Sequence, residues 1–596
     1  MSSTYELTDK QHNILLVAVN SKYIHLSLAP WYLKAYCEDE FFGISILETT
    51  INDDINVVLN RIYNKNAKIV GFSCYIWNIE YIIKLASTLK KALPETIIVF
   101  GGPEVSYETR QLMTDNRFID FVISGEGEKP FKNLLRKIVN DIGKYEDIKS
   151  LSFRDSGDIV QNAVDSPIEN LDLIPSPYTD SMISNIKNKI VYFESSRGCP
   201  FSCTYCLSSV SKGVRYFSMN RVMSDLERCK HAGITQIKFV DRTFNCNKNM
   251  ALQIFRFILE NREATNCHFE IGADLLDQEI LNLLEIMPAG WIQFEAGVQT
   301  TNTDVLRTIK RKTDLDKLYS NVKKIMEFGN IHLYLDLIAG LPGETYDSFK
   351  KSFNNVYLLK PHHLQLGFLK FLKGSQMRRD AKLYGCIYND YPPYEIISNK
   401  DISADELMKL KRIEDLVERY YNSGRFTKSL KLILDWTKLM PFDFYEGFMN
   451  YWVKCGYNLR PLPLKQLYGV LIDYVCSIYD KDTDFITMLK QMLRYDYVCT
   501  EKGAVLADCL KQHRQSVTNN FISDFLRDKS NIEKYLPDYA GTNLQILRKH
   551  IHMEHFDYDV VNFGENQRLP MKKHCLVLFD YNRKHAVSGK YANQLI

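Results

Sequence analysis

The sequence Cys199–Pro200–Phe201–Ser202–Cys203–Thr204–Tyr205–Cys206 places three cysteines within eight residues. Cysteine thiolates are the usual ligands of iron–sulfur clusters, and three of them can bind three irons of one [4Fe–4S] cubane. The fourth iron then stays open to a ligand that is not a protein side chain. A structural zinc site is the alternative, but zinc normally takes four protein ligands, and no partner Cys or His lies close in sequence. The spacing therefore predicts a [4Fe–4S] cluster held by Cys199, Cys203 and Cys206.

Strands and helices alternate around this loop, from about residue 190 to 375. The runs that read as strands are Ile190–Ser195, Gln236–Val240, His268–Gly272, Trp291–Ala296, Ile331–Ile338 and Leu364–Phe371. Strand–helix units in series predict a (β/α)6 partial TIM barrel over residues 188–385, with its site at the carboxyl ends of the strands. A second open sheet is the alternative.

A separate alternation precedes the barrel. Its β-rich runs are Ile14–Val19, Ile44–Thr49, Ile69–Ser73, Ile97–Phe100 and Phe118–Ile123. They predict a Rossmann-like parallel sheet over residues 1–140. Residues 141–187 are polar and rich in turn residues, so we expect a linker there. Residues 386–596 carry amphipathic helical patterns and predict a mainly helical domain, so that the fold class of the chain is α/β.

Composition describes an ordinary globular protein. The 596 residues carry a net charge of +3, which is no strong nucleic-acid signal. No apolar run approaches the length of a membrane span, and the polar start of the chain does not resemble a signal peptide. Most of the 14 cysteines stand singly in apolar runs, as buried thiols do. We therefore expect a cytoplasmic protein.

The C-x3-C-x2-C spacing, with an aromatic residue before the last cysteine, resembles the signature of the radical S-adenosylmethionine (SAM) superfamily. The resemblance implies that the amino and carboxylate groups of SAM chelate the open iron. An electron from an external donor of the flavodoxin or ferredoxin type would then release a 5′-deoxyadenosyl radical. Tyr205 would pack against the adenine, an ordinary strand-end aromatic being the alternative.

Later stretches also resemble these barrels, in particular those like coproporphyrinogen oxidase. They are Phe239–Asn245, Phe294–Gln299 and Asp336–Thr345, the last reading D-L-I-A-G-L-P-G-E-T. The resemblance implies that Asp241 contacts the methionyl amino group and that Gln299 and Asp336 approach the ribose. It also implies that Arg311 binds the SAM carboxylate, with a solvated helix charge as the alternative.

The N-terminal part resembles the cobalamin-binding-like domain of one group of radical SAM proteins. Gly71–Tyr75, Gly101–Ser106 and Gly125–Glu128 carry this resemblance. Many such domains have D-x-H-x-x-G after the first strand, with the histidine on cobalt. Here that loop reads Asn20–Leu26, without the Asp and Gly and with His25 displaced. We therefore expect the fold to be kept without its cofactor, with bound cobalamin as the alternative.

These expectations lead to a radical SAM enzyme acting on a small organic substrate. The whole chain resembles queuine lyase, which converts queuine to its aminomethyl 7-deazaguanine precursor, and this is the first hypothesis. The alternative is a cobalamin-dependent radical SAM methyltransferase. A non-catalytic binding protein is a third hypothesis, which the complete cysteine triad argues against. The C-terminal part resembles an uncharacterised domain of the same group.

Overall fold

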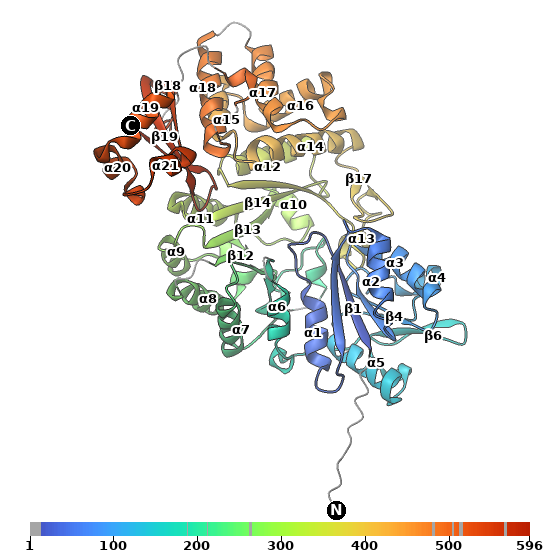
Figure 1. The fold of residues 1–596 in the computed structure, drawn as a ribbon. Helices are drawn as coiled ribbons and strands as arrows, with labels where there is room; N and C mark the ends of the chain where they lie inside the picture. The colour runs from blue at the N-terminus through green and yellow to red at the C-terminus, as the bar shows by residue number, and fades with distance from the viewer. Residues whose placement is uncertain are drawn as a thin grey trace, which may run out of the picture.

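The structure is a computed structural model. It describes residues 13–186, 189–210, 213–261, 265–479, 483–502, 506–511, 517–564 and 569–596. Figure 1 shows the N-terminal sheet in blue beside the green barrel, with the orange helices of the C-terminal part covering another side of the barrel. The N-terminal and C-terminal regions expected from the sequence therefore both lie against the barrel.

The described residues of the N-terminal part form a seven-stranded sheet with the order β2-β1-β3-β4-β5-β6-β7. Its strands are β1 (Ile14–Asn20), β2 (Ile44–Thr50), β3 (Ile69–Ser73), β4 (Ile97–Gly101), β5 (Phe121–Ile123), β6 (Leu151–Asp155) and β7 (Asp158–Gln161). The strands β1 to β5 are parallel, as predicted. Every residue of β1 is buried, because helices cover both faces of a parallel sheet.

Two apolar cores lie on the two faces of this sheet. One contains Val58 and Ile82, and the other contains Phe131 and Leu134. The helices that supply them are α1 (Leu28–Cys37), α2 (Ile55–Tyr63), α3 (Ile79–Ala92), α4 (Thr109–Asp115) and α5 (Glu128–Asn140). The carboxyl edge of the sheet thus remains the place where a ligand can approach.

The segment 141–187, expected to be a linker, extends this sheet. Its strands β6 and β7 add to the sheet in antiparallel fashion, with Phe153 opposite Phe121. Leu151 and Phe153 are buried there. Burial of these apolar side chains at the sheet edge explains why the segment is ordered as strands, although its composition resembles that of a loop. The short helix α6 (Asp180–Asn185) then leads to the barrel.

The described residues of the central part form a six-stranded parallel sheet, β15-β14-β13-β12-β11-β8, which confirms the partial barrel. Its strands are β8 (Val191–Phe193), β11 (Gln236–Phe239), β12 (Asn266–Ile271), β13 (Ile292–Gln299), β14 (His332–Ala339) and β15 (His363–Phe368). The covering helices are α7 (Met219–His231), α8 (Lys248–Glu260), α9 (Gln278–Glu285), α10 (Thr303–Thr308), α11 (Leu315–Phe328) and α12 (Tyr346–Tyr357). Burial alternates along β13 and β14, so apolar residues face the helices and polar residues face the lumen.

The C-terminal part is mainly helical, as expected. A short helix and a strand pair come first: α13 (Gln376–Arg379), β16 (Ile387–Tyr388) and β17 (Ile396–Ser398). Its longer helices are α14 (Ala404–Leu416), α15 (Thr427–Thr437), α16 (Pro441–Lys454), α17 (Leu464–Ile478) and α18 (Thr483–Thr500). Then follow α19 (Asn519–Arg527), α20 (Lys529–Tyr535), α21 (Leu544–His550), β18 (Ile551–Tyr558), β19 (Lys572–Lys584) and β20 (Tyr591–Leu595). These last strands form an antiparallel sheet that reaches the barrel, where His332 Nδ1 lies 3.0 Å from the Val587 carbonyl oxygen.

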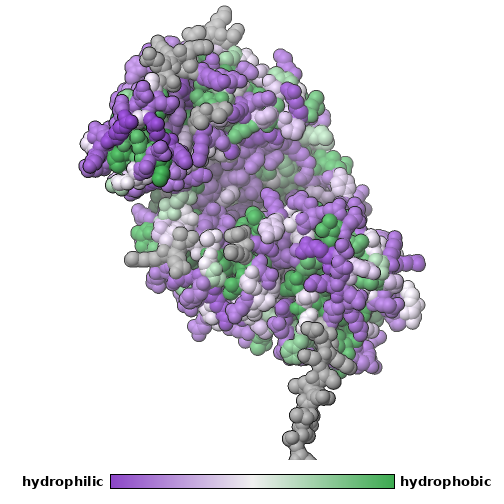
Figure 2. Space-filling model, in the orientation of Figure 1, coloured by the Kyte–Doolittle hydropathy of each residue, from purple (hydrophilic) through white to green (hydrophobic). Residues whose placement is uncertain are grey.

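Among the described residues, no helix is long and apolar enough to cross a membrane. The face in Figure 2 is largely hydrophilic, with apolar side chains in small groups.

Candidate active site

The three cysteines lie at the barrel mouth, on a loop that follows β8. Cys199 ends β9 (Ser196–Cys199), which pairs with β10 (Gly213–Tyr216) to form a hairpin, called here the cluster hairpin. Cys203 is buried, whereas Cys199 and Cys206 are partly exposed. The thiols are thus presented at the carboxyl ends of the strands, where the sequence placed them.

Backbone hydrogen bonds fasten the loop to neighbouring segments. The Thr204 amide donates to the Ile309 carbonyl (3.0 Å), and the Met377 amide donates to the Thr204 carbonyl (2.8 Å). The middle of the cysteine motif is therefore held by two segments far away in sequence.

The thiols fit a cluster better than a single ion. Among the described residues, no three His, Cys, Asp or Glu side chains are grouped so that they could hold one metal ion. Structural zinc requires four converging ligands, whereas a cubane offers a separate iron to each thiolate. The cluster assigned to these thiols therefore rests on the motif and stays a prediction here.

Gly198 allows the cluster hairpin to close. Its φ is +104°, and a Cβ added there would lie 2.2 Å from the Gly213 carbonyl oxygen. We expect Gly198→Ala to lower the thermal unfolding midpoint and the iron bound per chain, since strain of this kind costs about 1–3 kcal/mol before the clash is added. The control is Gly157→Ala, where φ is +95° but nothing lies within 4 Å of the added Cβ. Equal iron content and midpoints in the two variants would contradict this account.

A polar pocket built around Arg311 adjoins the cluster loop. Arg311 follows α10, and its Nη1 lies 3.4 Å from the Tyr205 hydroxyl and 3.9 Å from Cys203 Sγ. Its Nη2 donates to the Gly297 carbonyl. Asp336 stands opposite Gly297 in the pairing of β13 with β14. The structure therefore brings Tyr205 and Arg311 to one thiol of the triad, with Asp336 on the strand beside Gly297.

Several polar atoms of this pocket lack partners. Gln299 Oε1, Arg311 Nε and Asp336 Oδ1 are buried and have no hydrogen-bond partner among the described residues. Gln299 also has a φ of +70°, which is rare for a residue other than glycine. Buried polar groups are normally paired, so these atoms fit a bound polar ligand. A molecule with carboxylate, amino and ribose groups, such as SAM, offers the complementary donors and acceptors.

Burial, together with the nearby carboxylates of Glu295 and Glu270, raises the pKa of Asp336 to about 8. Glu270 also has a raised pKa because of burial. In contrast, the hydrogen bond from His268 (3.0 Å) lowers the pKa of Glu295. The lumen below the cluster loop is thus acidic, with Lys238 as a counter-charge 3.5 Å from Glu295.

Asp241 lies beneath the cluster hairpin. Its Oδ1 accepts from the Ser195 hydroxyl (2.7 Å) and from the Ser196 hydroxyl, and its Oδ2 accepts from the Ser195 amide (3.2 Å). Burial raises the pKa of this carboxyl. Contact with the methionyl amino group stays a prediction. In the structure the carboxylate holds the strand that leads into the cysteines.

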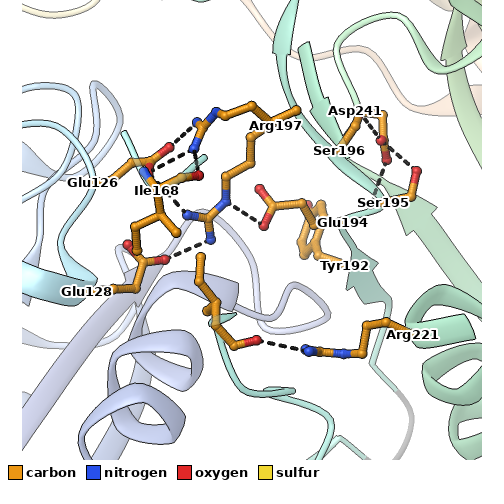
Figure 3. Close-up of polar contacts among 12 residues, drawn as sticks. Glu126, Glu128, Ile168, Tyr192, Glu194, Ser195, Ser196, Arg197, Arg221 and Asp241 are labelled. Carbon is orange, nitrogen blue, oxygen red and sulfur yellow. Dashed lines mark hydrogen bonds and ion pairs between the residues drawn. The ribbon is translucent and has the colours of Figure 1, made fainter. Parts of the chain in front are cut away.

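Charged residues next to the cysteines were missed by sequence reasoning. Figure 3 shows Arg197 between Glu128 of the N-terminal domain and Glu194 of the barrel. Burial raises the pKa of Glu194 to about 6. The only signal in the sequence is the pair of opposite charges in Glu194–Ser195–Ser196–Arg197, directly before the cysteine motif.

The loop Asn20–Leu26 contacts the barrel. His25 forms an isolated parallel bridge with Ile190, and its Nδ1 lies 2.9 Å from the Tyr192 hydroxyl. Burial lowers the pKa of His25. His25 is therefore engaged with the start of the barrel, and the expectation that it does not bind cobalt stays a prediction.

Glycines and aromatic residues lie at the carboxyl edge of the N-terminal sheet. Gly125 has a φ of +76°, with nothing within 4 Å of a Cβ added there, so open space lies above it. Gly102 approaches the Cys74 backbone so closely that an added Cβ would lie 2.5 Å from its carbonyl oxygen. Beside them Tyr75 stacks on Trp77 with 4.4 Å between ring centroids. These features fit a flat, bulky cofactor such as cobalamin.

Comparison with protein families assigns these regions. Residues 193–356 match the model of the radical SAM superfamily, and residues 14–135 match that of the B12 binding domain. The chain therefore contains a radical SAM domain and a B12-binding domain. Residues 382–579 match a family described as a protein of unknown function, DUF4080.

Curated relatives share part of the chain. One is the 2-(S-pantetheinyl)-carbapenam-3-carboxylate methyltransferase of Streptantibioticus cattleyicolor, 26% identical over 48% of this chain and 44% of that protein. Another is the cobalamin-dependent radical SAM methyltransferase TokK of Streptomyces tokunonensis, 23% identical over 64% of this chain and 61% of that protein. The chain therefore spans about half the length of these relatives.

Solved structures share the fold. OxsB with aqua-cobalamin and S-adenosylmethionine bound aligns with a TM-score of 0.59 and 16% identity, over 83% of this chain and 82% of that one. TsrM from Kitasatospora setae with cobalamin and a [4Fe–4S] cluster bound aligns with a TM-score of 0.53 and 17% identity, over 64% of this chain and 78% of that one. At this identity the likeness establishes the arrangement of the domains and not the reaction.

The queuine lyase hypothesis is wrong. The relatives above are named as methyltransferases, and the B12 binding domain model matches residues 14–135. The expectation of a domain without its cofactor is corrected for the same reason, since a displaced histidine does not exclude cobalamin binding. The findings favour the methyltransferase alternative.

Proposed function

We propose that this protein is a cobalamin-dependent radical SAM methyltransferase that acts on a small molecule. The observation that carries the proposal is the contact between the two cofactor regions. The sheet edge at Gly125 continues into Glu126 and Glu128, whose carboxylates pair with Arg197, two residues before Cys199. A ligand bound at this edge of the B12-binding domain would therefore lie close to a ligand bound to the cluster.

The three bound groups would supply the radical chemistry and the methyl group: the cluster an electron, SAM the 5′-deoxyadenosyl radical, and cobalamin the methyl carrier. In this proposal Cys199, Cys203 and Cys206 hold the cluster. The protein then has to bind, orient and shield these groups.

Each pocket residue has a proposed contact with SAM. Arg311 binds the carboxylate, because its guanidinium is buried with an unpaired Nε facing the pocket. Gln299 and Asp336 contact the ribose, and Tyr205 packs against the adenine. The high pKa of Asp336 keeps this carboxyl protonated near neutral pH, so that it can donate a hydrogen bond as well as accept one.

The proposal divides the work among the domains. Residues 1–140 bind cobalamin, residues 188–385 bind the cluster and SAM, and residues 386–596 cover the barrel. An external donor of the flavodoxin or ferredoxin type supplies the electron. Since radicals react with solvent-borne reductants, closure of β8 by the loop that contains His25 would protect the reaction.

Cobalamin content tests the proposal. We expect anaerobically reconstituted protein to retain about one hydroxocobalamin per chain, by the stoichiometry that one domain implies. With trideuteromethyl SAM and a reductant, a small-molecule extract should yield products that carry the label by mass spectrometry. Folded, cluster-loaded protein that retains no cobalamin would refute the proposal.

Matched glycine variants locate the cobalamin site. Gly125→Phe should lose cobalamin and keep the cluster, because the side chain would fill the open space at the sheet edge. Gly143→Phe is the control, since Gly143 has a similar φ of +82° and also has nothing within 4 Å, but lies beyond the far end of α5. Equal cobalamin binding by both variants would exclude this edge as the site.

A further inference from the structure

A short segment joins the ligand edge of the N-terminal sheet to the cluster hairpin. Gly125 lies at the open edge after β5, and its amide donates to the Ser106 hydroxyl (3.0 Å). Three residues later, Glu128 begins α5. The segment Gly125–Glu128 therefore has one end at the proposed cobalamin site and the other end against the barrel.

Arg197 receives the carboxylates of this segment. Its Nη2 lies 2.7 Å from Glu128 Oε1 and its Nη1 lies 3.8 Å from Glu126 Oε2. Its Nε donates to Glu194 Oε2 at 3.0 Å (Figure 3). The side chains of Arg197 and Glu128 are only 12% and 6% exposed. One guanidinium thus connects the N-terminal domain, β8 and the strand that ends in Cys199.

Arg215 makes the same connection from the second strand of the hairpin. It stands opposite Arg197 in the register of β9 with β10. Its Nη1 donates to Glu126 Oε2 (3.2 Å) and to the Ile168 carbonyl (2.6 Å). Both strands of the cluster hairpin are therefore tied to the same acidic segment.

The two partners of a buried ion pair of this kind do not move independently of each other. A buried carboxylate that loses its guanidinium partner is left uncompensated at low dielectric, so the groups move together or not at all. A ligand that shifts Gly125 would displace Glu126 and Glu128, and with them the hairpin that carries Cys199. The sequence separation of about 70 residues between the partners makes this a tertiary link.

We infer that Arg197 is a positioning residue that couples ligand binding at the sheet edge near Gly125 to binding of the iron–sulfur cluster. This inference rests on the proposed function, because cobalamin is the ligand assigned to that edge. Coupling of this kind is reciprocal, so the cluster must change cobalamin affinity by the same factor by which cobalamin changes cluster binding.

The experiment compares hydroxocobalamin affinity with and without the cluster, by absorbance titration of the full chain under anaerobic conditions. The cluster-free state is the variant with Cys199, Cys203 and Cys206 replaced by alanine. In the wild type the two dissociation constants should differ by about fivefold or more, the usual lower range for coupled sites. Adding Arg197→Gln to both states should lower this ratio clearly, although the contact of Arg215 with Glu126 remains.

The control is Arg221→Gln. Arg221 is a similarly buried arginine, which donates to Asp225 (2.6 Å) and to the Ile174 carbonyl (2.9 Å). Within the described part of the chain, it forms no hydrogen bond or ion pair with Gly125–Glu128. It should keep the wild-type ratio. If Arg197→Gln fails to fold by circular dichroism, Glu128→Gln takes its place with the same expected loss of coupling.

Two results would overturn the inference and can be told apart. Hydroxocobalamin binding with equal affinity in both wild-type states would remove the coupling. An unchanged ratio in Arg197→Gln would remove Arg197 from it, and either result would leave the proposed function intact. Failure of either wild-type state to bind hydroxocobalamin would overturn the proposed cofactor and the coupling together.

Discussion

Replacement of Cys199, Cys203 and Cys206 by alanine is expected to abolish iron binding and all formation of 5′-deoxyadenosine. The three thiolates are the only ligands that the motif offers to the cluster, and without the cluster no electron reaches SAM. The measurements are iron and sulfide content, the brown absorbance of the reconstituted protein, and mass spectrometry of SAM products.

A matched control is Cys229→Ala, which removes a buried thiol of α7 in the same domain. It should keep the cluster and full SAM cleavage, because this thiol fills apolar space and lies outside the loop. A triple variant that still made 5′-deoxyadenosine would eliminate the cysteine loop as the cluster site.

Arg311→Ala should weaken SAM binding by about tenfold or more while the cluster remains. A charge-assisted contact to a carboxylate contributes about 1.5–3 kcal/mol, and the neighbouring buried groups would lose their partner as well. Isothermal titration of cluster-loaded protein with SAM measures this loss, and iron content verifies that the loop is intact.

The control for this variant is Arg307→Ala. Arg307 lies on α10 close to Arg311 in sequence, but its side chain is 77% exposed and forms an ion pair with the exposed Asp304. Its removal should leave SAM affinity within about twofold, as expected for a surface ion pair. Equal SAM affinity in both variants would mean that Arg311 does not bind SAM.

The parts of the site that sequence analysis found depend on short-range patterns. The triad could be predicted because its ligands lie within eight residues of one another, on one loop. The parallel strands could be predicted because the order of apolar and polar residues along β1 and β13 matches the burial of these strands. Gln299, Arg311 and Asp336 came from a resemblance, and the structure places their polar atoms around one pocket.

Sequence analysis gave wrong expectations where it relied on local composition, because composition does not show which residues meet in the fold. Residues 151–161 are polar enough to read as a linker, yet Leu151 and Phe153 find buried positions at the sheet edge. The displaced His25 suggested a lost cofactor, because a missing ligand is visible in a sequence while an open sheet edge is not. The comparison with the B12 binding domain corrected that expectation.

By itself, the sequence determined the spacing of the three cysteines that we predict to hold the cluster, the alternation of strands and helices, and the order of the three regions along the chain. These properties are set by residues a few positions apart, through thiolate spacing and through periodic burial. The tertiary structure alone decided that Glu128 meets Arg197, that His25 meets Tyr192, and that Arg311 reaches Cys203. Such pairs are separated by about 70 to 170 residues in the chain, and charges or hydroxyls on any of them would look equally solvated in the sequence. Burial in the folded chain brings these groups together, because a buried charge or polar group without a partner is costly.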